Sequence, residues 1–242
     1  MSDMRVIRLD TVDSTNTYLH AYRGDEDVVV VTARHQTAGR GQGGNRWEDA
    51  EGQNLLFSIQ IRPVEVAIGH QFVLAMAEAL ALKRALDAYA DGMELKWPND
   101  IYHRDRKLSG TLIETAVSGG RLKRMILGTG INVNQRRFTS DAPNPVSLSQ
   151  ITGSDESIDH LLERILQAFD DYYRRVLEGD YAGISHEYHE ALYRRKGFYR
   201  YRDADGEFDA ELVGVAYDGR LSLRDSEGRQ RSYAFKEVEF II

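Results

Sequence analysis

The chain has 242 residues, 42% of them hydrophobic, and a formal net charge of −7. This length and apolar content predict one large globular domain, or a domain and a half, with a real core. The acidic balance argues against nucleic acid as a general partner. The lack of cysteine excludes disulfides, thiolate metal sites and a cysteine nucleophile. Neither a signal peptide nor a membrane-length apolar run is present, so we predict a soluble, cytoplasmic protein.

Hydrophobic periodicity predicts strands alternating with helices over the first half of the chain. Strands are predicted at residues 5–9, 28–34, 54–61, 92–97, 101–102, 108–117 and 122–133. Helices are predicted at residues 18–22 and 68–89, and the second is the longest because no breaker interrupts its alanine- and leucine-rich interior. Ser118, Gly119 and Gly120 between the last two strands predict a hairpin.

The second half of the sequence predicts a polar loop and two helices, and then short strands separated by glycine-containing turns. Residues 134–145 form a polar loop with two prolines that is long enough to be functional. Helices are predicted at residues 157–177 and 181–193, followed by short strands at 207–215, 220–224 and 231–235. Asp-Gly and Glu-Gly pairs mark the turns between these strands. We therefore predict a boundary near Tyr193, with one domain at residues 1–193 and a small β-barrel-like domain at residues 194–242.

The loop from Gly39 to Trp47 contains four glycines and two arginines. Glycine lets a backbone approach a ligand closely, and arginine offers donors to carboxylate or phosphate. The loop is therefore a candidate anion-binding site, with a polar surface loop as the ordinary alternative. A dinucleotide-binding loop is excluded because a strand follows instead of a helix. A kinase glycine loop is excluded because the sequence has no Asp-Phe-Gly motif.

Six short motifs occur together along the chain. They are Asp13–Asn16, Gln36–Gly41, Lys96–Asp100, Arg106–Gly110, Gly128–Asn132 and Asn144–Leu148. In this order and spacing they resemble the biotin–protein ligases, over the whole chain, in the short form without an N-terminal DNA-binding domain. The resemblance implies an α+β fold. Its central sheet would be mixed and largely antiparallel, flanked by helices, in a class II synthetase-like catalytic domain that precedes a small SH3-like β-barrel.

The resemblance also implies a two-step reaction with ATP, Mg²⁺ and biotin. The biotin carboxylate attacks the α-phosphate of ATP to give biotinyl-5′-AMP and pyrophosphate, and a lysine of a biotin carboxyl carrier domain then accepts the biotin. Because two anions must meet in the first step, the site needs fixed cations and a metal ion. DNA and membrane are not implied as partners. A homodimer through the sheet strands and the identity of the acceptor carboxylase are left open.

The family pattern assigns roles to individual residues. Lys107 and Arg40 are the expected catalytic cations, with Lys107 on the biotin carboxylate and the bridging phosphoryl oxygen and Arg40 on phosphate under an ordered loop. The residues expected around biotin are Ser14, Thr15, Asn16, Gln36, Arg40, Gly41, Gln42, Lys107, Gly110 and Gly130, the two last leaving room for the flat bicycle. Those expected around ATP or the adenylate are Arg40, Trp47, Asn99, Asp100, Lys107 and Asn132, with Asp100 also as a Mg²⁺ ligand.

Ordinary structural roles compete with some of these assignments. Ser14–Asn16 could cap the following helix, Asn99 and Asp100 could shape a turn, and most lysines at a strand start, as Lys107 is, are solvated. One position departs from the best-studied family pattern, because Gln42 stands where that pattern has a second loop arginine. We therefore expect Gln42 to hold the adenylate less firmly than an arginine at this position would.

Two other functions remain as alternatives. A lipoate–protein ligase or octanoyl transferase would share the fold, although the cysteine-dependent transferases are excluded by composition. That alternative gives no explanation for Lys96–Asp100 beside Arg106 and Lys107. A non-catalytic sensor of biotin or its adenylate has little support, because the chain is acidic and shows no DNA-binding segment.

Overall fold

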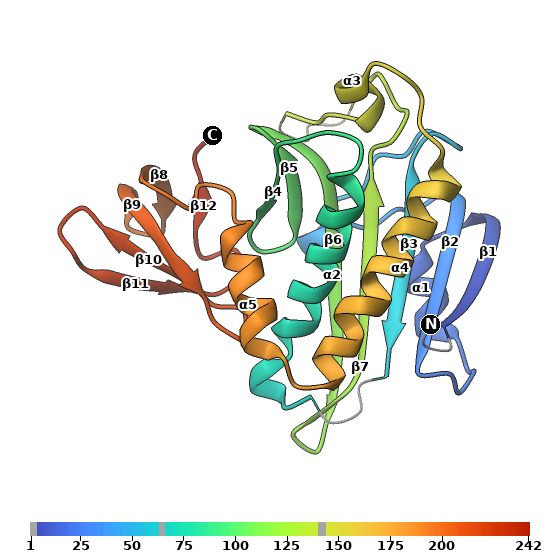
Figure 1. Cartoon of the computed structure of the whole chain (residues 1–242), viewed down its shortest axis with the longest axis horizontal. Helices are drawn as coiled ribbons and strands as arrows, with labels where there is room; N and C mark the ends of the chain where they lie inside the picture. Colours follow the sequence, from blue (N-terminus) through green and yellow to red (C-terminus); the bar gives the residue numbers. More distant parts are fainter. Residues whose placement is uncertain (1–3, 63–65, 140–143) are drawn as a thin grey trace.

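The computed structural model describes residues 4–62, 66–139 and 144–242. A seven-stranded sheet forms its larger part (Figure 1), in the order β1-β2-β3-β7-β6-β5-β4. Its strands are β1 (Met4–Val12), β2 (Val28–Gln36), β3 (Leu55–Ile61), β4 (Met93–Lys96), β5 (Asp100–His103), β6 (Arg106–Ser118) and β7 (Arg121–Ile131). β1 and β2 are parallel and every other pair is antiparallel. The predicted mixed, largely antiparallel sheet is confirmed.

Helices cover both faces of this sheet. α2 (Phe72–Leu86), α4 (Ile158–Leu177) and α5 (Tyr181–Glu190) pack together on the near face in Figure 1, while α1 (Thr15–Ala21) contacts β2, β3 and β7 from the other side. α2 is buried almost all round because it lies between the sheet and α4, which explains its alanine and leucine content. α2 is shorter than the predicted helix at 68–89, because Ile68–His70 form a separate 3₁₀ turn, η2, and α2 ends at Leu86.

The strand pattern follows from burial on both faces. Val28 and Val30 belong to the large core under α2, whereas Val29 and Val31 pack with Leu19 of α1. All residues of β3 are buried. A strand covered on both sides reads as an uninterrupted apolar run, which is why these two strands were predictable. Residues 140–143 of the predicted polar loop, and Pro63 after β3, lie outside the described residues.

A second, five-stranded antiparallel sheet follows the helices, in the order β11-β10-β9-β8-β12. Its strands are β8 (Phe198–Asp203), β9 (Gly206–Val215), β10 (Leu221–Asp225), β11 (Gln230–Tyr233) and β12 (Glu239–Phe240). β9, β10 and β11 were predicted from the sequence, whereas β8 and β12 were not. The structure thus confirms a second sheet unit, while its SH3-like character and the boundary near Tyr193 stay predictions.

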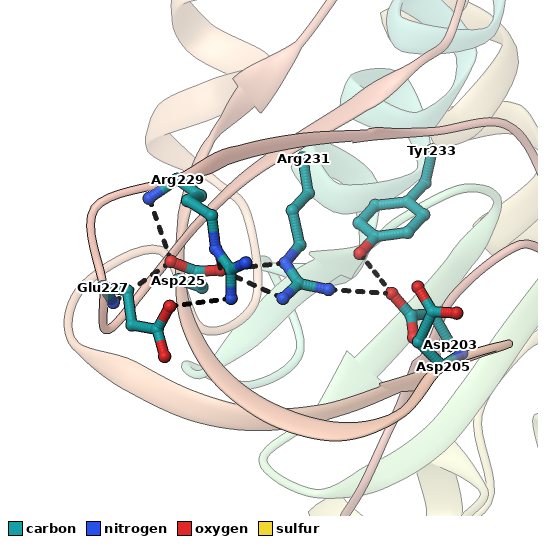
Figure 2. Close-up of polar contacts among 7 residues, drawn as sticks. All are labelled: Asp203, Asp205, Asp225, Glu227, Arg229, Arg231 and Tyr233. Atoms are coloured by element: carbon teal, nitrogen blue, oxygen red, sulfur yellow. Dashed lines mark hydrogen bonds and ion pairs between the residues drawn. The ribbon is translucent and has the colours of Figure 1, made fainter.

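Buried ion pairs tie three strands of the second sheet together (Figure 2). The Arg231 guanidinium lies between two carboxylates, 3.2 Å from Asp203 Oδ2 and 3.0 Å from Asp225 Oδ2. The Tyr233 hydroxyl donates to the same Asp203 oxygen at 2.7 Å. Both carboxylates are less than a tenth exposed, so removing one partner would leave an unpaired buried charge. The network fixes the end of β11 relative to β8 and β10.

The second sheet docks on the turn that follows β4. The buried Trp97 donates its indole Nε1 to the Gly219 carbonyl at 2.9 Å, and the Phe235 ring meets it edge-on at 5.5 Å. The Phe72 amide at the start of α2 also donates to the Tyr217 carbonyl at 3.0 Å. These contacts place the last residues of the chain beside the large sheet. Among the described residues, no helix is long and apolar enough to cross a membrane.

Candidate active site

A cavity of about 1230 Å³ opens beside β5, β6 and β7. This exceeds the range of about 300–1,000 Å³ that is usual for a pocket that takes one small molecule. Its lining includes every residue that the sequence analysis assigned to biotin or ATP. The structure therefore brings the predicted site residues together, while their individual roles stay predictions. The cavity is also lined by residues from the second sheet unit, which the sequence did not indicate.

The cavity lies on the face of the sheet away from α2. A Cβ added at Gly128 of β7 would point toward Asn16, and one added at Gly130 would point toward Trp47. Thr129, between the two glycines, points to the other face and donates to Glu78 of α2. This alternation is that of a β-strand. Gly128 was not predicted, although its Gly-x-Gly spacing with Gly130 places both on one face. A methyl group at Gly128 would collide with the Asn16 carboxamide, so the glycine is needed for that side chain to lie on the sheet.

Short polar side chains form one end of the cavity. Gln36 Oε1 accepts from the Thr15 amide at 2.8 Å and from the Thr15 hydroxyl at 3.1 Å, which orients the Gln36 amide. The hydroxyl of Ser58, a residue that was not predicted, lies within hydrogen-bond distance of Thr15 Oγ1 at 2.7 Å and of Asn16 Oδ1 at 2.6 Å. Gln36 Nε2 and the Ser14 hydroxyl have no hydrogen bond within the described ranges. They are the polar groups left for a ligand.

The alternative role of Ser14, a side-chain cap of α1, is wrong. Ser14 is the N-cap of α1 by backbone conformation, but its side chain makes no capping hydrogen bond. Asp13 Oδ1 instead accepts from the Ser14 amide at 2.7 Å. Ser14 is 3% exposed and lines the cavity, and its hydroxyl does not serve the helix end.

Glu114 of β6 holds the loop arginine. Its carboxylate accepts from Asn16 Nδ2 at 2.7 Å, lies 3.1 Å from His20 Nε2 and pairs with Arg40 at 3.1 Å. Although burial favours the neutral acid, the hydrogen bonds from Asn16 and His20 and the charge of Arg40 hold the pKa of Glu114 below its ordinary value. Arg40 remains half-exposed, so an incoming anion can compete with Glu114 for it.

The glycine-rich loop is folded back on itself. The Gly41 amide donates to the Asn45 carbonyl at 2.7 Å and the Trp47 amide to the Gly39 carbonyl at 3.1 Å, with the 3₁₀ turn η1 (Gln42–Gly44) at the tip. The indole of Trp47 lies on Gly130, where any side chain would collide with it. The room that Gly130 provides is thus taken by Trp47, and not left open for a ligand as expected.

Lys107 faces the cavity in an ion pair, and it is not a solvated strand-start lysine. Its Nζ lies 2.7 Å from Asp100 Oδ1, and both side chains are mostly buried. A Cβ at Gly110 would come within 3.1 Å of both groups, so glycine makes room for the pair. Asn99 donates its side-chain amide to the Thr111 carbonyl, which is the turn-shaping role. Asn132, nearly buried, donates to the Val146 carbonyl at 3.2 Å.

A second partly buried lysine, Lys96, was left out of the predicted site. Lys96 Nζ lies 4.7 Å from the centre of the Phe240 ring and 5.2 Å from that of Tyr102. Burial lowers the pKa of Lys96, the nearby charge of Lys107 lowers it further, and Asp100 opposes the change. Sequence reasoning could not find this arrangement, because Phe240 comes from the far end of the chain.

The acidic side chains of the site are few. Across the described ranges, no group of three or more histidine, aspartate or glutamate side chains could hold a metal ion. Magnesium bound with a nucleotide usually takes only one or two carboxylates, with phosphate oxygens and water as its other ligands. Asp100 fits that role, since Oδ1 contacts Lys107 and no hydrogen bond in the described part occupies Oδ2.

Comparison with known proteins decides the family. Residues 9–132, just over half of the chain, match the model described as the biotin/lipoate A/B protein ligase family. The chain belongs to this family. Among its biotin/lipoate ligase relatives is the bifunctional ligase/repressor BirA of Bacillus spizizenii, 30% identical over 95% of this chain and 72% of that protein. The biotin--[acetyl-CoA-carboxylase] ligase of Paracoccus denitrificans is 29% identical over 92% of this chain and 95% of the relative.

Solved structures of the biotin/lipoate ligase family share the fold. The biotin protein ligase of Aquifex aeolicus in complex with biotin and ATP superposes with a TM-score of 0.81, 26% identity and 97% coverage of both chains. The Paracoccus denitrificans and Aquifex aeolicus relatives are both named as biotin ligases. The chain therefore stands in the biotin–protein ligase branch of the family, as its six motifs predicted.

Proposed function

We propose that the protein is an ATP-dependent ligase that forms biotinyl-5′-AMP and then transfers biotin to a lysine of a biotin carboxyl carrier domain. One observation carries the proposal. The cations Lys107 and Arg40 line the same cavity as the free polar groups of Ser14 and Gln36. A site of this kind suits a ligand with a polar ring at one end and a carboxylate at the other.

The polar end would bind the ureido group of biotin. That group has two N–H donors and one carbonyl acceptor. The Ser14 hydroxyl can accept from an N–H, and Gln36 Nε2 can donate to the carbonyl, because its Oε1 is already committed to Thr15. Asn16 would act indirectly, since both ends of its carboxamide are occupied by Ser58 and Glu114. Gly41 and Gln42 would contribute from the loop.

The cationic end would carry the chemistry. An oxygen of the biotin carboxylate forms a bond to the α-phosphorus of ATP, the bond to the bridging oxygen breaks, and pyrophosphate leaves. Lys107 would neutralise charge on the carboxylate and the α-phosphoryl oxygens, which is worth most where water is excluded. Mg²⁺, with Asp100 as a protein ligand, would neutralise charge on the departing phosphates. Trp47, Asn99 and Asn132 would contact the nucleotide.

The loop would close over the adenylate. When a phosphate binds, Arg40 would exchange its half-exposed contact with Glu114 for the phosphate, and the folded hairpin around it would shield the mixed anhydride from water. In the second step the acceptor amine attacks the anhydride carbonyl, AMP leaves, and the amine loses its proton. The catalytic unit would be residues 1–193, and residues 194–242 would form an SH3-like domain.

The direct test is incubation with biotin, MgATP and a carrier domain. We expect biotin-dependent release of pyrophosphate and a mass gain on the carrier lysine, with neither when lipoate replaces biotin. Lys107→Ala should reduce adenylate formation by a factor of about 10²–10³, the usual loss for a group that stabilises developing charge. Lys123→Ala, which removes an exposed lysine of β7 away from the cavity, is the matched control. Equal activity of Lys107→Ala and the native protein would overturn the proposed role.

A further inference from the structure

Lys236 has a backbone conformation that lysine rarely adopts. It lies in the turn between β11 and β12, with φ of 70°. This left-handed region is disfavoured for residues other than glycine, asparagine and aspartate, and it persists only where the surroundings hold it in place. Most positions with a positive φ among the described residues are occupied by glycine.

The turn that carries Lys236 is anchored on both sides. Before it, Tyr233 is fixed by its hydrogen bond to Asp203 (Figure 2). Within it, the Ala234 amide donates to Glu237 Oε2 at 2.6 Å, and Phe235 packs against the buried Trp97. These contacts attach the turn to the large sheet unit and define where the side chain of Lys236 starts.

The ammonium of Lys236 lies on the glycine-rich loop. A methyl group added at Gly43 would collide with Lys236 Nζ, and Gly43 itself has φ of 68°. Lys236 lines the cavity together with Arg40 and Arg46. Its side chain is exposed and makes no ion pair or hydrogen bond in the described part of the chain. It is a cation at the tip of the loop with no anionic partner there.

Gln42, the residue next to Gly43, stands where the resemblance leads one to expect a second loop arginine. We propose that Lys236 supplies this second cation from the other sheet unit and binds a phosphate oxygen of ATP. A compact ammonium on a flexible stem can follow the phosphates as the loop closes. The inference rests on the proposed function and deepens it, because it assigns part of the nucleotide site to the C-terminal sheet.

The test compares Lys236→Met, which keeps the length of the side chain and removes its charge, with Lys123→Met as control. In Lys236→Met we expect the affinity for ATP in direct binding to fall about tenfold, as for loss of one charge-assisted hydrogen bond. The KM for ATP in biotin-dependent pyrophosphate release should rise by the same factor. Biotin affinity without nucleotide should not change. Lys236→Gly relieves the backbone strain and removes the same charge, so it should show the same loss. ATP binding equal to the native protein in both variants would overturn the proposal.

A rescue experiment separates a charge effect from a structural one. Gln42→Arg in the Lys236→Met background should recover most of the lost ATP affinity, because it returns a cation to the same loop. Lack of recovery, or an equal loss of biotin affinity, would mean that Lys236 supports the loop and does not bind phosphate. If ATP binding depends on Lys236 but no pyrophosphate is released, the ligase function fails and the phosphate site stands.

Discussion

Glu78 of α2 should make the stability of the protein fall as pH rises. It is buried on the face of the sheet opposite the cavity, where its Oε1 accepts from the hydroxyls of Thr129 at 2.7 Å and Thr111 at 3.2 Å. Burial raises the pKa of Glu78 to about 7, and the two hydroxyls oppose the change only in part. The carboxyl is thus neutral in the folded protein at pH values where it is ionised in the unfolded chain.

The direction of this pH dependence follows from the protons bound by the folded and unfolded states. Between the ordinary pKa of 4.5 and about 7 the folded state holds a proton that the unfolded state has lost, so the free energy of unfolding decreases with pH. Above about 7 the folded protein must bury a charge, and the penalty is complete. At about 1.4 kcal/mol for each pKa unit, the whole penalty is about 3 kcal/mol, of which about 2 to 3 kcal/mol develops between pH 5 and 8.5.

Urea unfolding of the native protein and Glu78→Gln at several pH values tests this. The difference between their free energies of unfolding should move by about 2 to 3 kcal/mol in favour of the glutamine variant as pH rises from 5 to 8.5. Glu51→Gln removes a carboxylate from the surface and controls for the change in net charge. A difference that stays constant over this range would refute the reasoning.

Two further substitutions test contacts of the site and of the interface between the sheets. Gly128→Ala should weaken biotin binding at least about tenfold in calorimetry, because its methyl group would displace the Asn16 carboxamide. The control Gly69→Ala, which has open space around it, should keep the native affinity. Native affinity in Gly128→Ala would contradict this reasoning. Trp97→Phe should lower the free energy of unfolding by about 1–3 kcal/mol, because a buried carbonyl loses its donor. Trp47→Phe should cost less, since the Trp47 Nε1 has no partner within the described residues; equal losses would exclude the hydrogen bond as the cause.

Apolar periodicity in the sequence predicted the helices and strands that are buried in the core. The valine run at 28–31 and the helix around Met76 follow directly from apolar periodicity. α3 (Leu148–Thr152) was missed, although Ser147 and Gln150 form a complete capping box there and the Ser-x-x-Gln spacing was visible. β8 was missed as well, even though its alternating aromatic and arginine residues at Phe198–Asp203 have strand period.

The lining of the cavity was predictable where its residues belong to contiguous motifs. The pairing of Lys107 with Asp100 joins two such motifs on neighbouring strands. The environment of Lys96 was not predictable, because it depends on how Phe240 docks from a separate sheet. The same holds for Lys236, whose contact with Gly43 joins residues far apart in the chain. No local pattern encodes the relative placement of two packed units, so residues contributed across their interface are found only in three dimensions.

The position of Ile242 has a practical consequence. It is about half exposed and belongs to the cavity lining, next to the segment that packs on Lys96. Any polypeptide joined after it, such as a purification tag or a fusion partner, would leave from the mouth of the cavity and compete with whatever enters there. Met4, by contrast, begins an edge strand at the opposite side of the large sheet. Tags for immobilisation or labelling are therefore better attached before Met4 than after Ile242.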